Sequence, residues 1–273
     1  MTAPVALAIL DTGYCTARAN FVARGTGWHE IRCHAPAFLI RHPARGALLF
    51  DTGYAPRLLE AFAHWPDRLY KYATPTTIGT SALLQLEAHA VSGADVRTVI
   101  VSHLHADHVA GLHDFPQARF VMSRAALALQ QSARGIDAVR RGILQRLFPT
   151  DFVARSTVIE RLDGAPLPHL GATHDLFDDG SVVLVGMPGH ARGQLGALLR
   201  TDRGPVLLCA DGAWTSQAYR ELRPPHPITA LMQDDMHALS RTLKALQQFA
   251  ATRPDVTILP THCPDTLAWG RNA

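Results

Sequence analysis

The residues with the clearest chemical potential are four metal-binding side chains that fall within six consecutive positions. They follow a short apolar run, 98–101, in the segment Ser102-His103-Leu104-His105-Ala106-Asp107-His108. The His-x-His spacing can direct two imidazoles at one cation, and the adjacent Asp-His pair can reach a second. Imidazole and carboxylate ligands together suit zinc and its first-row neighbours. This spacing predicts a metal site, because isolated histidines that cap, pack or lie in solvent do not cluster in this way.

Three later apolar runs also end in a side chain that can bind a metal. Each alone would more often be an ordinary histidine or a turn aspartate. Because open α/β sheets place their sites at the carboxyl ends of strands, we expect these side chains to converge with the first segment. The runs 181–185, 206–209 and 256–259 lead to His190, Asp211 and His262, respectively.

The elements that would position these residues alternate between strands and helices. Leucines at helical spacing predict a helix at 80–91 and another that begins at the N-cap candidate Asp235 and ends before Pro254. Strands in both halves with helices between them indicate an α/β layered architecture. Strand-like runs occur at 5–10, 37–40, 47–50, 98–101, 119–122, 181–185, 206–209 and 256–259.

The segment 123–163 differs from the rest in its basic, helical character. It predicts helices at 125–131 and 136–148. Such a charge run is typical of a solvated helical face; the alternative is a lid whose arginines face an anionic or polar substrate. No Pro-, Gly- or Ser-rich linker divides the chain, so we expect one domain, residues 1–273, with 123–163 as a helical basic insert. Its arginines are Arg124, Arg134, Arg140, Arg141, Arg146, Arg155 and Arg161, against Asp137, Asp151 and Glu160.

The composition is that of a globular protein with ample material for a core. The 273 residues are 47% hydrophobic and 18% charged, which excludes disorder, collagen and coiled coil. No apolar run approaches the roughly 18 to 20 residues of a membrane span, and residues 1–10 lack the basic start of a secretory signal. The four scattered cysteines are interpreted as reduced thiols. We therefore expect a cytoplasmic protein, and the net charge of +3 does not indicate nucleic-acid binding.

The complete ligand pattern resembles the metallo-β-lactamase superfamily in its dinuclear hydrolase form. The resemblance covers nearly the whole chain and includes the runs Leu49-Phe50-Asp51-Thr52-Gly53 and Pro188-Gly189-His190. It implies an αββα sandwich of two related halves with the metal site at one edge. It also implies that Asp51 orients the metal-binding loop, the alternative being a plain turn aspartate. The implied ligands are His103, His105 and His190 for one ion, Asp107, His108 and His262 for the other, and Asp211 as the bridge.

Two such ions imply hydrolytic chemistry. A water that they share loses a proton near neutral pH, so that a bridging hydroxide becomes the nucleophile. One ion would polarise the carbonyl or phosphoryl oxygen of the substrate, and the other would stabilise the leaving oxygen. Asp107 is a candidate for carrying a proton towards the leaving group. Zinc is the expected metal, although manganese, iron or cobalt would fit the same ligands.

Within the superfamily the chain looks most like the N-acyl-homoserine lactonase branch, the quorum-quenching enzymes. Further matches are Gly111 after the first motif, Gly193-Gln194 after His190, and the run Asp235-x-x-Ala238-Leu239-Ser240. The branch carries an oxyanion-stabilising tyrosine three residues after the bridging aspartate. Here that position is Trp214, whose indole N–H is a donor of different shape, and Tyr219 is either a substitute or an ordinary packed tyrosine. We predict an enzyme that opens a lactone or a related ester.

Other functions are weaker predictions. A zinc β-lactamase lacks the bridging aspartate, and a glyoxalase II-like thioesterase normally has a basic C-terminal patch, whereas only Arg271 follows His262 here. A phosphodiesterase needs a more basic surface, although the arginine-rich insert keeps it an alternative. A non-catalytic binding protein would be expected to have lost ligands. We expect a small-molecule substrate and neither a nucleic-acid nor a membrane partner, and the sequence makes no prediction of the oligomeric state.

Overall fold

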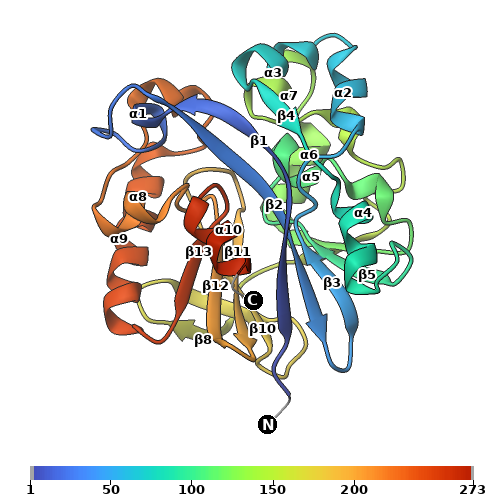
Figure 1. Cartoon of the computed structure of the whole chain (residues 1–273), viewed down its shortest axis with the longest axis vertical. Coiled ribbons are helices and arrows are strands. Elements are labelled where there is room, and N and C mark those ends of the chain that lie inside the picture. The colour runs from blue at the N-terminus through green and yellow to red at the C-terminus, as the bar shows by residue number, and fades with distance from the viewer. Residues whose placement is uncertain (1–2, 272–273) are drawn as a thin grey trace.

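The computed structural model of the chain describes residues 3–271 and shows two β-sheets packed face to face between two layers of helices (Figure 1). The first sheet has seven strands in the order β4-β1-β2-β3-β5-β6-β7, and the second has six in the order β13-β12-β11-β10-β9-β8. This arrangement confirms the αββα sandwich that the sequence predicted.

The first sheet changes from antiparallel to parallel at its centre. β1 pairs antiparallel with β4 and β2, and β2 pairs antiparallel with β3. From β3 onward the neighbours β5, β6 and β7 run parallel. The strands are β1 (Ala6–Arg18), β2 (Glu30–His42), β3 (Gly46–Phe50), β4 (Thr76–Ile78), β5 (Val96–Ile100), β6 (Arg119–Ser123) and β7 (Ser156–Ile159).

The second sheet is antiparallel from β8 to β12, and its last pair, β12 and β13, is parallel. Its strands are β8 (Gly164–Leu167), β9 (Gly171–Asp175), β10 (Val182–Gly186), β11 (Leu195–Thr201), β12 (Gly204–Ala210) and β13 (Thr257–Pro260).

Helices cover the outer face of each sheet. Over the first sheet lie α2 (Arg57–Phe62), α3 (Arg68–Ala73), α4 (Ala82–Leu86), α5 (Ala106–Val109), α6 (Arg124–Ser132) and α7 (Gly135–Arg140). On the other side lie α1 (Ala19–Val22), α8 (Ser216–Arg220) and α9 (Met236–Thr252), and α10 (Pro264–Arg271) ends the described chain. Short 3₁₀ turns are η1 (Glu87–His89), η2 (Leu112–Asp114), η3 (Gln145–Leu147) and η4 (Pro227–Leu231). As expected, Asp235 caps α9, since its Oδ1 accepts from the N–H groups of His237 and Ala238.

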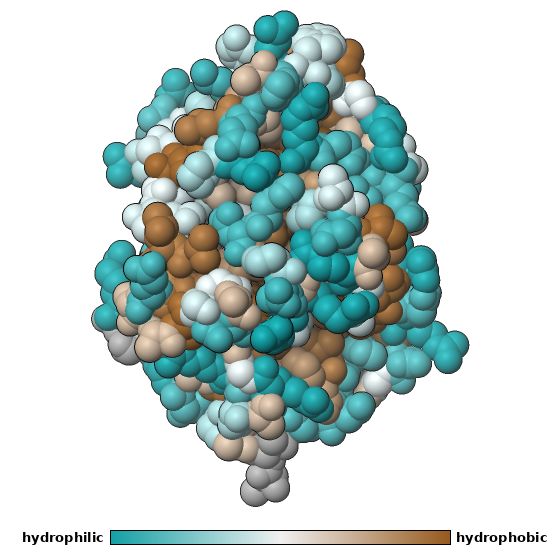
Figure 2. All heavy atoms as spheres, turned by 90° about the vertical axis from the view of Figure 1, so that its right-hand side faces the viewer, coloured by the Kyte–Doolittle hydropathy of each residue, from teal (hydrophilic) through white to brown (hydrophobic). Residues whose placement is uncertain are grey.

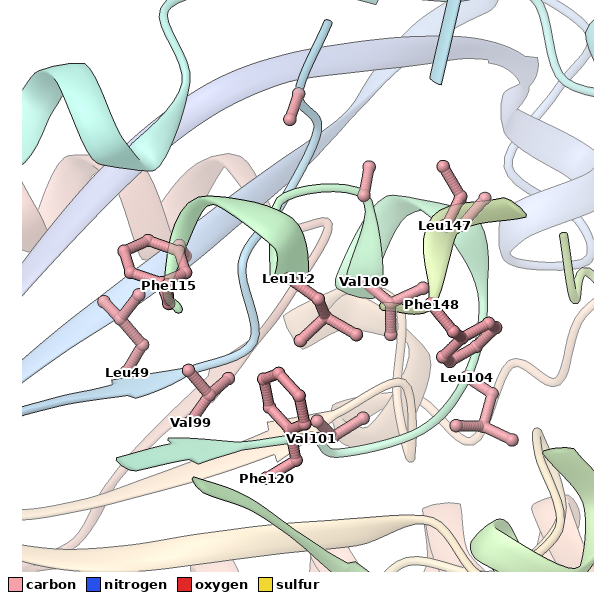
Figure 3. Close-up of a cluster of buried hydrophobic side chains, with 14 of the residues drawn as sticks. Leu49, Val99, Val101, Leu104, Val109, Leu112, Phe115, Phe120, Leu147 and Phe148 are labelled. Atoms are coloured by element: carbon pink, nitrogen blue, oxygen red, sulfur yellow. The ribbon is translucent and has the colours of Figure 1, made fainter. Parts of the chain in front are cut away.

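Strand alternation divides the apolar side chains among three layers. Successive residues of a strand point to opposite faces, so Leu48 and Phe50 of β3 lie between the two sheets while Leu49 faces the helices. In Figure 3, Leu49 and Val99 from the sheet lie beneath the side chains of Leu112 and its neighbours. This packing fixes the segment that follows β5 against the first sheet.

Several predicted elements differ from those in the structure. The expected helix 136–148 ends at Arg140, because Gly142 adopts a left-handed conformation (φ 71°) and the chain continues into η3. The helix expected at 80–91 is divided into α4 and η1. β1 runs on to Arg18, and several strands were not predicted, because their polar or glycine-containing sequences do not alternate clearly. These strands are β4, β7, β8, β9 and β11.

None of the described helices is both long and apolar enough to cross a membrane. Figure 2 shows the face over α2 to α7 as mainly hydrophilic, with separate hydrophobic patches between polar side chains.

Candidate metal centre

The predicted ligands all follow the carboxyl ends of strands, and the two sheets bring these ends together. β5 leads into the segment that carries four of them, and β10 leads to His190. The parallel pairing of β12 with β13 places Ala210 opposite Pro260, so Asp211 and His262 emerge at the same edge. In the first sheet, Phe50 pairs with Ile100, which brings Asp51 beside the segment that follows β5.

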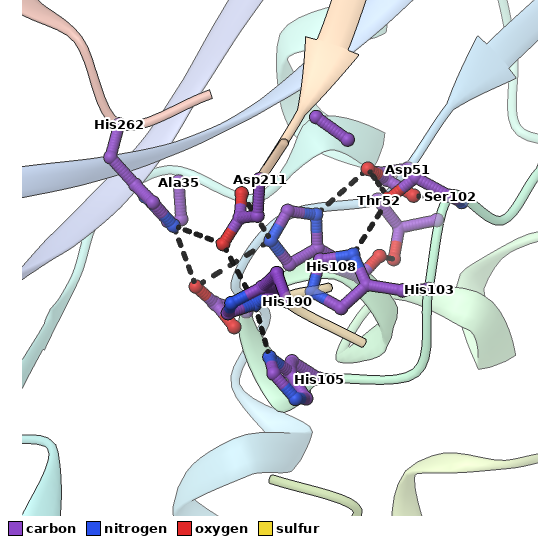
Figure 4. Close-up of polar contacts among 12 residues, drawn as sticks. Ala35, Asp51, Thr52, Ser102, His103, His105, His108, His190, Asp211 and His262 are labelled. Atoms are coloured by element: carbon purple, nitrogen blue, oxygen red, sulfur yellow. Dashed lines mark hydrogen bonds and ion pairs between the residues drawn. The ribbon is translucent and has the colours of Figure 1, made fainter. Parts of the chain in front are cut away.

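The seven predicted ligands form one buried cluster (Figure 4). The most exposed of them, Asp107, retains only 8% of its accessible surface. Their nitrogen and carboxylate oxygen atoms make three overlapping groups, within each of which all donor atoms lie within 4.8 Å of one another. The groups are His103–His105–His190, His103–His108–Asp211 and Asp107–His108–His262.

Asp211 occupies the centre of this cluster. Its Oδ2 lies 3.1 Å from Nε2 of His190 and 3.0 Å from Nε2 of His262. Its Oδ1 lies 3.5 Å from Nε2 of His108. One carboxylate thus reaches imidazoles of both predicted ligand sets, which is the position that a bridging ligand requires.

Four of the five imidazoles are held by a hydrogen bond from Nδ1, the ring nitrogen that faces away from the cluster. Carboxylate, amide and carbonyl oxygens accept but cannot donate, so Nδ1 carries a proton, and Nε2 is the nitrogen that faces inward, where a cation would bind it. Ser102 Oγ accepts from His103 for the same reason, because its own proton goes to Asp51. Outer hydrogen bonds of this kind orient metal-binding histidines. The pairs are His103 with Ser102 Oγ (3.0 Å), His108 with Asp51 Oδ2 (2.8 Å), His190 with Gln233 Oε1 (2.7 Å) and His262 with the His34 carbonyl (2.6 Å).

Several of the inward-facing atoms have no partner within residues 3–271. Nε2 of His103, Nε2 of His108 and Oδ1 of Asp211 are buried and make no hydrogen bond. Burying an unpaired polar atom is costly, and a divalent cation satisfies lone pairs of this kind. The chemistry of the donor set therefore fits divalent cations.

The electrostatics of the protein alone are consistent with a cation site. Burial lowers the pKa of His103 and of His105 well below the usual value. Burial alone would lower the pKa of His108, but the carboxylates of Asp107, Asp51 and Asp211 outweigh it and raise the pKa to about 9. At His262 burial is likewise outweighed, chiefly by Asp211, and the pKa rises to about 10. Burial is also outweighed at Asp211, where the surrounding imidazoles hold the pKa well below its usual range. Metal binding must then release protons from His108 and His262, the two histidines whose pKa is raised.

Asp51 connects the metal-binding segment to the first sheet. Its Oδ1 accepts from the backbone N–H of Ser102 (2.8 Å), and its Oδ2 accepts from Ser102 Oγ (2.7 Å) and His108 Nδ1 (2.8 Å). The side chain is fully buried, and its φ of 57° is a left-handed conformation that a non-glycine residue adopts at a cost. These contacts support the positioning role that the resemblance implied.

We expect Asp51→Asn to weaken metal binding or turnover by about 10- to 100-fold, the range for outer-shell partners of metal ligands. The amide keeps the size of the side chain but turns one acceptor into a donor, which opposes either Ser102 or the Nδ1–H of His108. Competition with a chromogenic chelator measures the metal affinity. Asp255→Asn, at an exposed residue paired with Arg253, is the control. Unchanged metal affinity and turnover in Asp51→Asn would contradict the positioning role.

Trp214 and Tyr219, the two candidates for oxyanion stabilisation, lie in different environments. The indole Nε1 of Trp214 donates to Asp211 Oδ2 at 2.9 Å, and its ring meets the His190 ring edge-on at 5.5 Å. Tyr219 is buried in the apolar cluster beside α9, with Leu243 and Phe249, and none of its described contacts reaches the ligands. Trp214 is therefore the candidate that touches the site.

Two residues at the site were not identified from the sequence. Gln233 accepts from His190, and Gly142 lies against the ring of His105, where an added Cβ would be 2.5 Å from Cδ2. Gln233 is far from His190 in the chain and belongs to no motif, so only the fold reveals the pair. The positive φ of Gly142 is the kind of position that glycine occupies, but the contact with His105 depends on tertiary structure.

Comparisons with known proteins agree with this geometry. The family model of the metallo-beta-lactamase superfamily matches residues 31–262. The chain is 28% identical to the N-acyl homoserine lactonase AttM of Agrobacterium fabrum, over 97% of this chain and 95% of the relative. It is 25% identical to a probable metallo-hydrolase of Mycobacterium tuberculosis, over 89% and 78% of the two chains.

Solved structures share the fold at low sequence identity. A variant of B. thuringiensis AiiA with N-decanoyl-L-homoserine bound at its active site superposes with a TM-score of 0.73 at 16% identity, covering 98% of this chain and 97% of that one. AidC, described as a dizinc quorum-quenching lactonase, gives 0.67 at 16% identity, covering 97% and 89%. The family match spans both sheets and ends at the last of the seven clustered side chains, so the chain belongs to the metallo-beta-lactamase superfamily.

Proposed function

We propose that the chain is a dinuclear metal-dependent hydrolase that opens a lactone ring, with N-acyl homoserine lactones as the first substrate class to test. The observation that carries the proposal is the buried cluster of seven donors whose outer hydrogen bonds turn the imidazole Nε2 atoms inward. The lactone substrate is supported by the relatives named N-acyl homoserine lactonase, which match nearly the whole chain.

The proposed ligands follow the grouping in the structure. Cations held there supply Lewis-acid polarisation of the ester carbonyl and activation of a water molecule. Zinc stays the predicted metal, since imidazole and carboxylate are its usual ligands. The first set is His103, His105 and His190, the second is Asp107, His108 and His262, and Asp211 lies between them.

Asp107 is placed to move a proton during ring opening. Its Oδ2 lies 3.6 Å from Nε2 of His262 and 3.7 Å from Nε2 of His108, while its Oδ1 makes no hydrogen bond within the described chain. The Asp107 side chain is 11% exposed, which is more than the side chains of the other clustered residues that form ion pairs, His108, His190, Asp211 and His262. Water adds to the ester carbon, the ring C–O bond breaks, and Asp107 Oδ1 passes the proton of that water to the departing alkoxide. The product is the hydroxy acid.

Trp214 holds the central carboxylate in place. We expect Trp214→Phe to keep both metal ions and to lower kcat by about 10-fold, the effect of losing one hydrogen bond to a charged group. The phenyl ring preserves the packing on His190 but lacks the N–H that Asp211 accepts. Steady-state kinetics with N-hexanoyl homoserine lactone, together with metal analysis, measures this. Trp65→Phe, at an exposed tryptophan, is the control; loss of metal, or unchanged kinetics, would argue against this role for Trp214.

A hydrolysis panel on purified protein of known metal content tests the function. It contains short- and long-chain acyl homoserine lactones, simple γ- and δ-lactones, S-lactoylglutathione, nitrocefin and bis-p-nitrophenyl phosphate. We expect turnover of a homoserine lactone. Turnover of the phosphodiester alone would replace the lactonase proposal by the phosphodiesterase alternative, and turnover of the thioester alone would replace it by the glyoxalase II-like one.

A further inference from the structure

A cavity of about 330 Å³ lies against the metal-ligand cluster, on the side of His105 and His190. One wall comes from the basic segment 123–163, where Arg140 and Arg141 close α7. The opposite wall comes from residues 230–234, which include the end of η4 and lead to the N-cap of α9. The cavity therefore begins at two predicted metal ligands and extends away from them between two walls that combine charged and amide side chains with apolar ones such as Ile143, Leu231 and Met232.

Two residues that line this cavity carry hydrogen-bond donors without acceptors. Gln233 is 9% exposed, and its Oε1 is engaged by His190, which leaves Nε2 buried without a partner. Arg141 donates from Nε to Asp137 at 2.9 Å, and its two Nη groups make no hydrogen bond within the described chain. Unpaired donors at a cavity wall favour a ligand that brings acceptor oxygens.

The charges that surround the cavity leave an excess of one positive charge. Arg140 and Arg141 share a single carboxylate, that of Asp137, at 3.0 and 2.9 Å. The third lining arginine, Arg192, pairs with Asp234 at 3.1 Å. Three guanidinium groups thus face two carboxylates, and the fork of a guanidinium matches a carboxylate or phosphate oxygen pair.

Other arginines of the basic segment do not contribute to this cavity. Arg124 pairs with Glu160, Arg155 with Asp151 at 3.0 Å, and Arg161 with Asp163 at 3.1 Å. Arg124 and Arg161 are exposed, as the prediction of a solvated face requires, whereas Arg155 is largely buried and donates to the backbone carbonyls of Phe115 and Ala118. Among the arginines of 123–163, Arg140 and Arg141 are the ones that line this cavity.

We propose that this cavity binds a carboxylate carried by the substrate at the end of the substituent remote from the lactone ring. This inference rests on the proposed function and names its substrate class: an acyl lactone whose side chain ends in a carboxylate. A neutral alkyl chain would cover the Nη groups of Arg141 without offering them an acceptor. A phosphate monoester carries nearly two negative charges at neutral pH, more than the single positive charge left uncompensated here, whereas a carboxylate carries one.

The test compares ligands of equal chain length with the metal-loaded protein. N-adipoyl homoserine lactone and N-hexanoyl homoserine lactone both have six-carbon acyl chains, and only the first ends in a carboxylate. Turnover gives kcat/KM for each lactone. Isothermal titration calorimetry of the ring-opened products, N-adipoyl-L-homoserine and N-hexanoyl-L-homoserine, gives affinities that do not depend on turnover. A lactone of the same length that ends in a phosphate monoester forms a third arm.

Arg141→Gln removes the unpaired guanidinium donors, and Arg124→Gln is the matched control in the same segment, at an arginine paired with Glu160. We expect the wild-type protein and Arg124→Gln to prefer the adipoyl over the hexanoyl ligand by about 10- to 100-fold in both measurements, the range for one charge-assisted hydrogen bond. Arg141→Gln should lose that preference, with its metal content unchanged.

The outcomes separate the two proposals. Equal affinity for the two products in the wild-type protein, or a preference that survives in Arg141→Gln, overturns the carboxylate site even if both lactones are hydrolysed. An Arg141-dependent preference in calorimetry without turnover of any lactone supports the site and removes the lactonase proposal. Tighter binding of the phosphate ligand than of the adipoyl ligand overturns the choice of carboxylate.

Discussion

Asp211→Ala will reduce the metal content of the chain from two ions to one or none and will lower lactone turnover by at least about 10³-fold. Its two oxygens lie within 3.0 to 3.5 Å of imidazoles from both ligand sets, so its removal affects both metal positions. The change also leaves the indole N–H of Trp214 without its acceptor. An unpaired buried donor adds its own cost to the loss of the bridging carboxylate.

Metal analysis of the purified variant and steady-state kinetics measure this result, and circular dichroism shows whether the variant folds. Asp163→Ala, at an exposed aspartate paired with Arg161, controls for the loss of a carboxylate elsewhere. If Asp211→Ala retained two ions and full turnover, its assignment as the bridge would be wrong.

Gly142→Ala will displace the ring of His105 and lower both metal occupancy and turnover, by about 10²-fold for turnover if one ligand is misplaced. The added Cβ would lie 2.5 Å from Cδ2 and 2.9 Å from Cγ of His105, which is closer than carbon atoms can approach. The backbone has little freedom to relieve this contact, because the Gly142 carbonyl accepts from the N–H of Ala106 at 3.1 Å. The φ of 71° adds conformational strain of about 1 to 3 kcal/mol.

Gly135→Ala is a control that separates strain from contact. Gly135 also has a positive φ, 57°, and lies in the same segment, but an added Cβ there meets nothing within 4 Å. We expect Gly135→Ala to lower the melting temperature with normal metal content, and Gly142→Ala to lose metal as well. Equal metal content in the two variants would contradict the proposed effect of this contact on the predicted ligand His105.

The sequence predicted which side chains gather in the cluster, because each carries a local signal. His103 to His108 is a dense motif, and the later ligands each follow an apolar run that becomes a strand. The layered fold then accounts for their convergence, since the ends of β5, β10, β12 and β13 all reach one edge of the two sheets.

The residues that surround the ligands were harder to predict, because their roles arise only from tertiary contacts. Gln233 becomes a partner of His190 when the segment before α9 folds back over the β10 turn, where the N–H of Asp234 also donates to the His190 carbonyl. The sequence predicted a helix through residue 148, but α7 ends at Arg140, just before Gly142 with its positive φ. The arginines of 123–163 look alike in sequence, and only the fold separates Arg140 and Arg141 from those paired on the surface.

The most direct test of the dinuclear hydrolase is a titration of metal-free protein with Zn²⁺ in which lactone turnover is measured at each metal-to-chain ratio. Inductively coupled plasma mass spectrometry of the same samples gives the bound metal. We expect activity on N-acyl homoserine lactone to rise with bound metal and to reach its plateau at two ions per chain. A plateau at one ion, turnover that does not depend on metal, or two bound ions without turnover of any homoserine lactone would contradict this expectation.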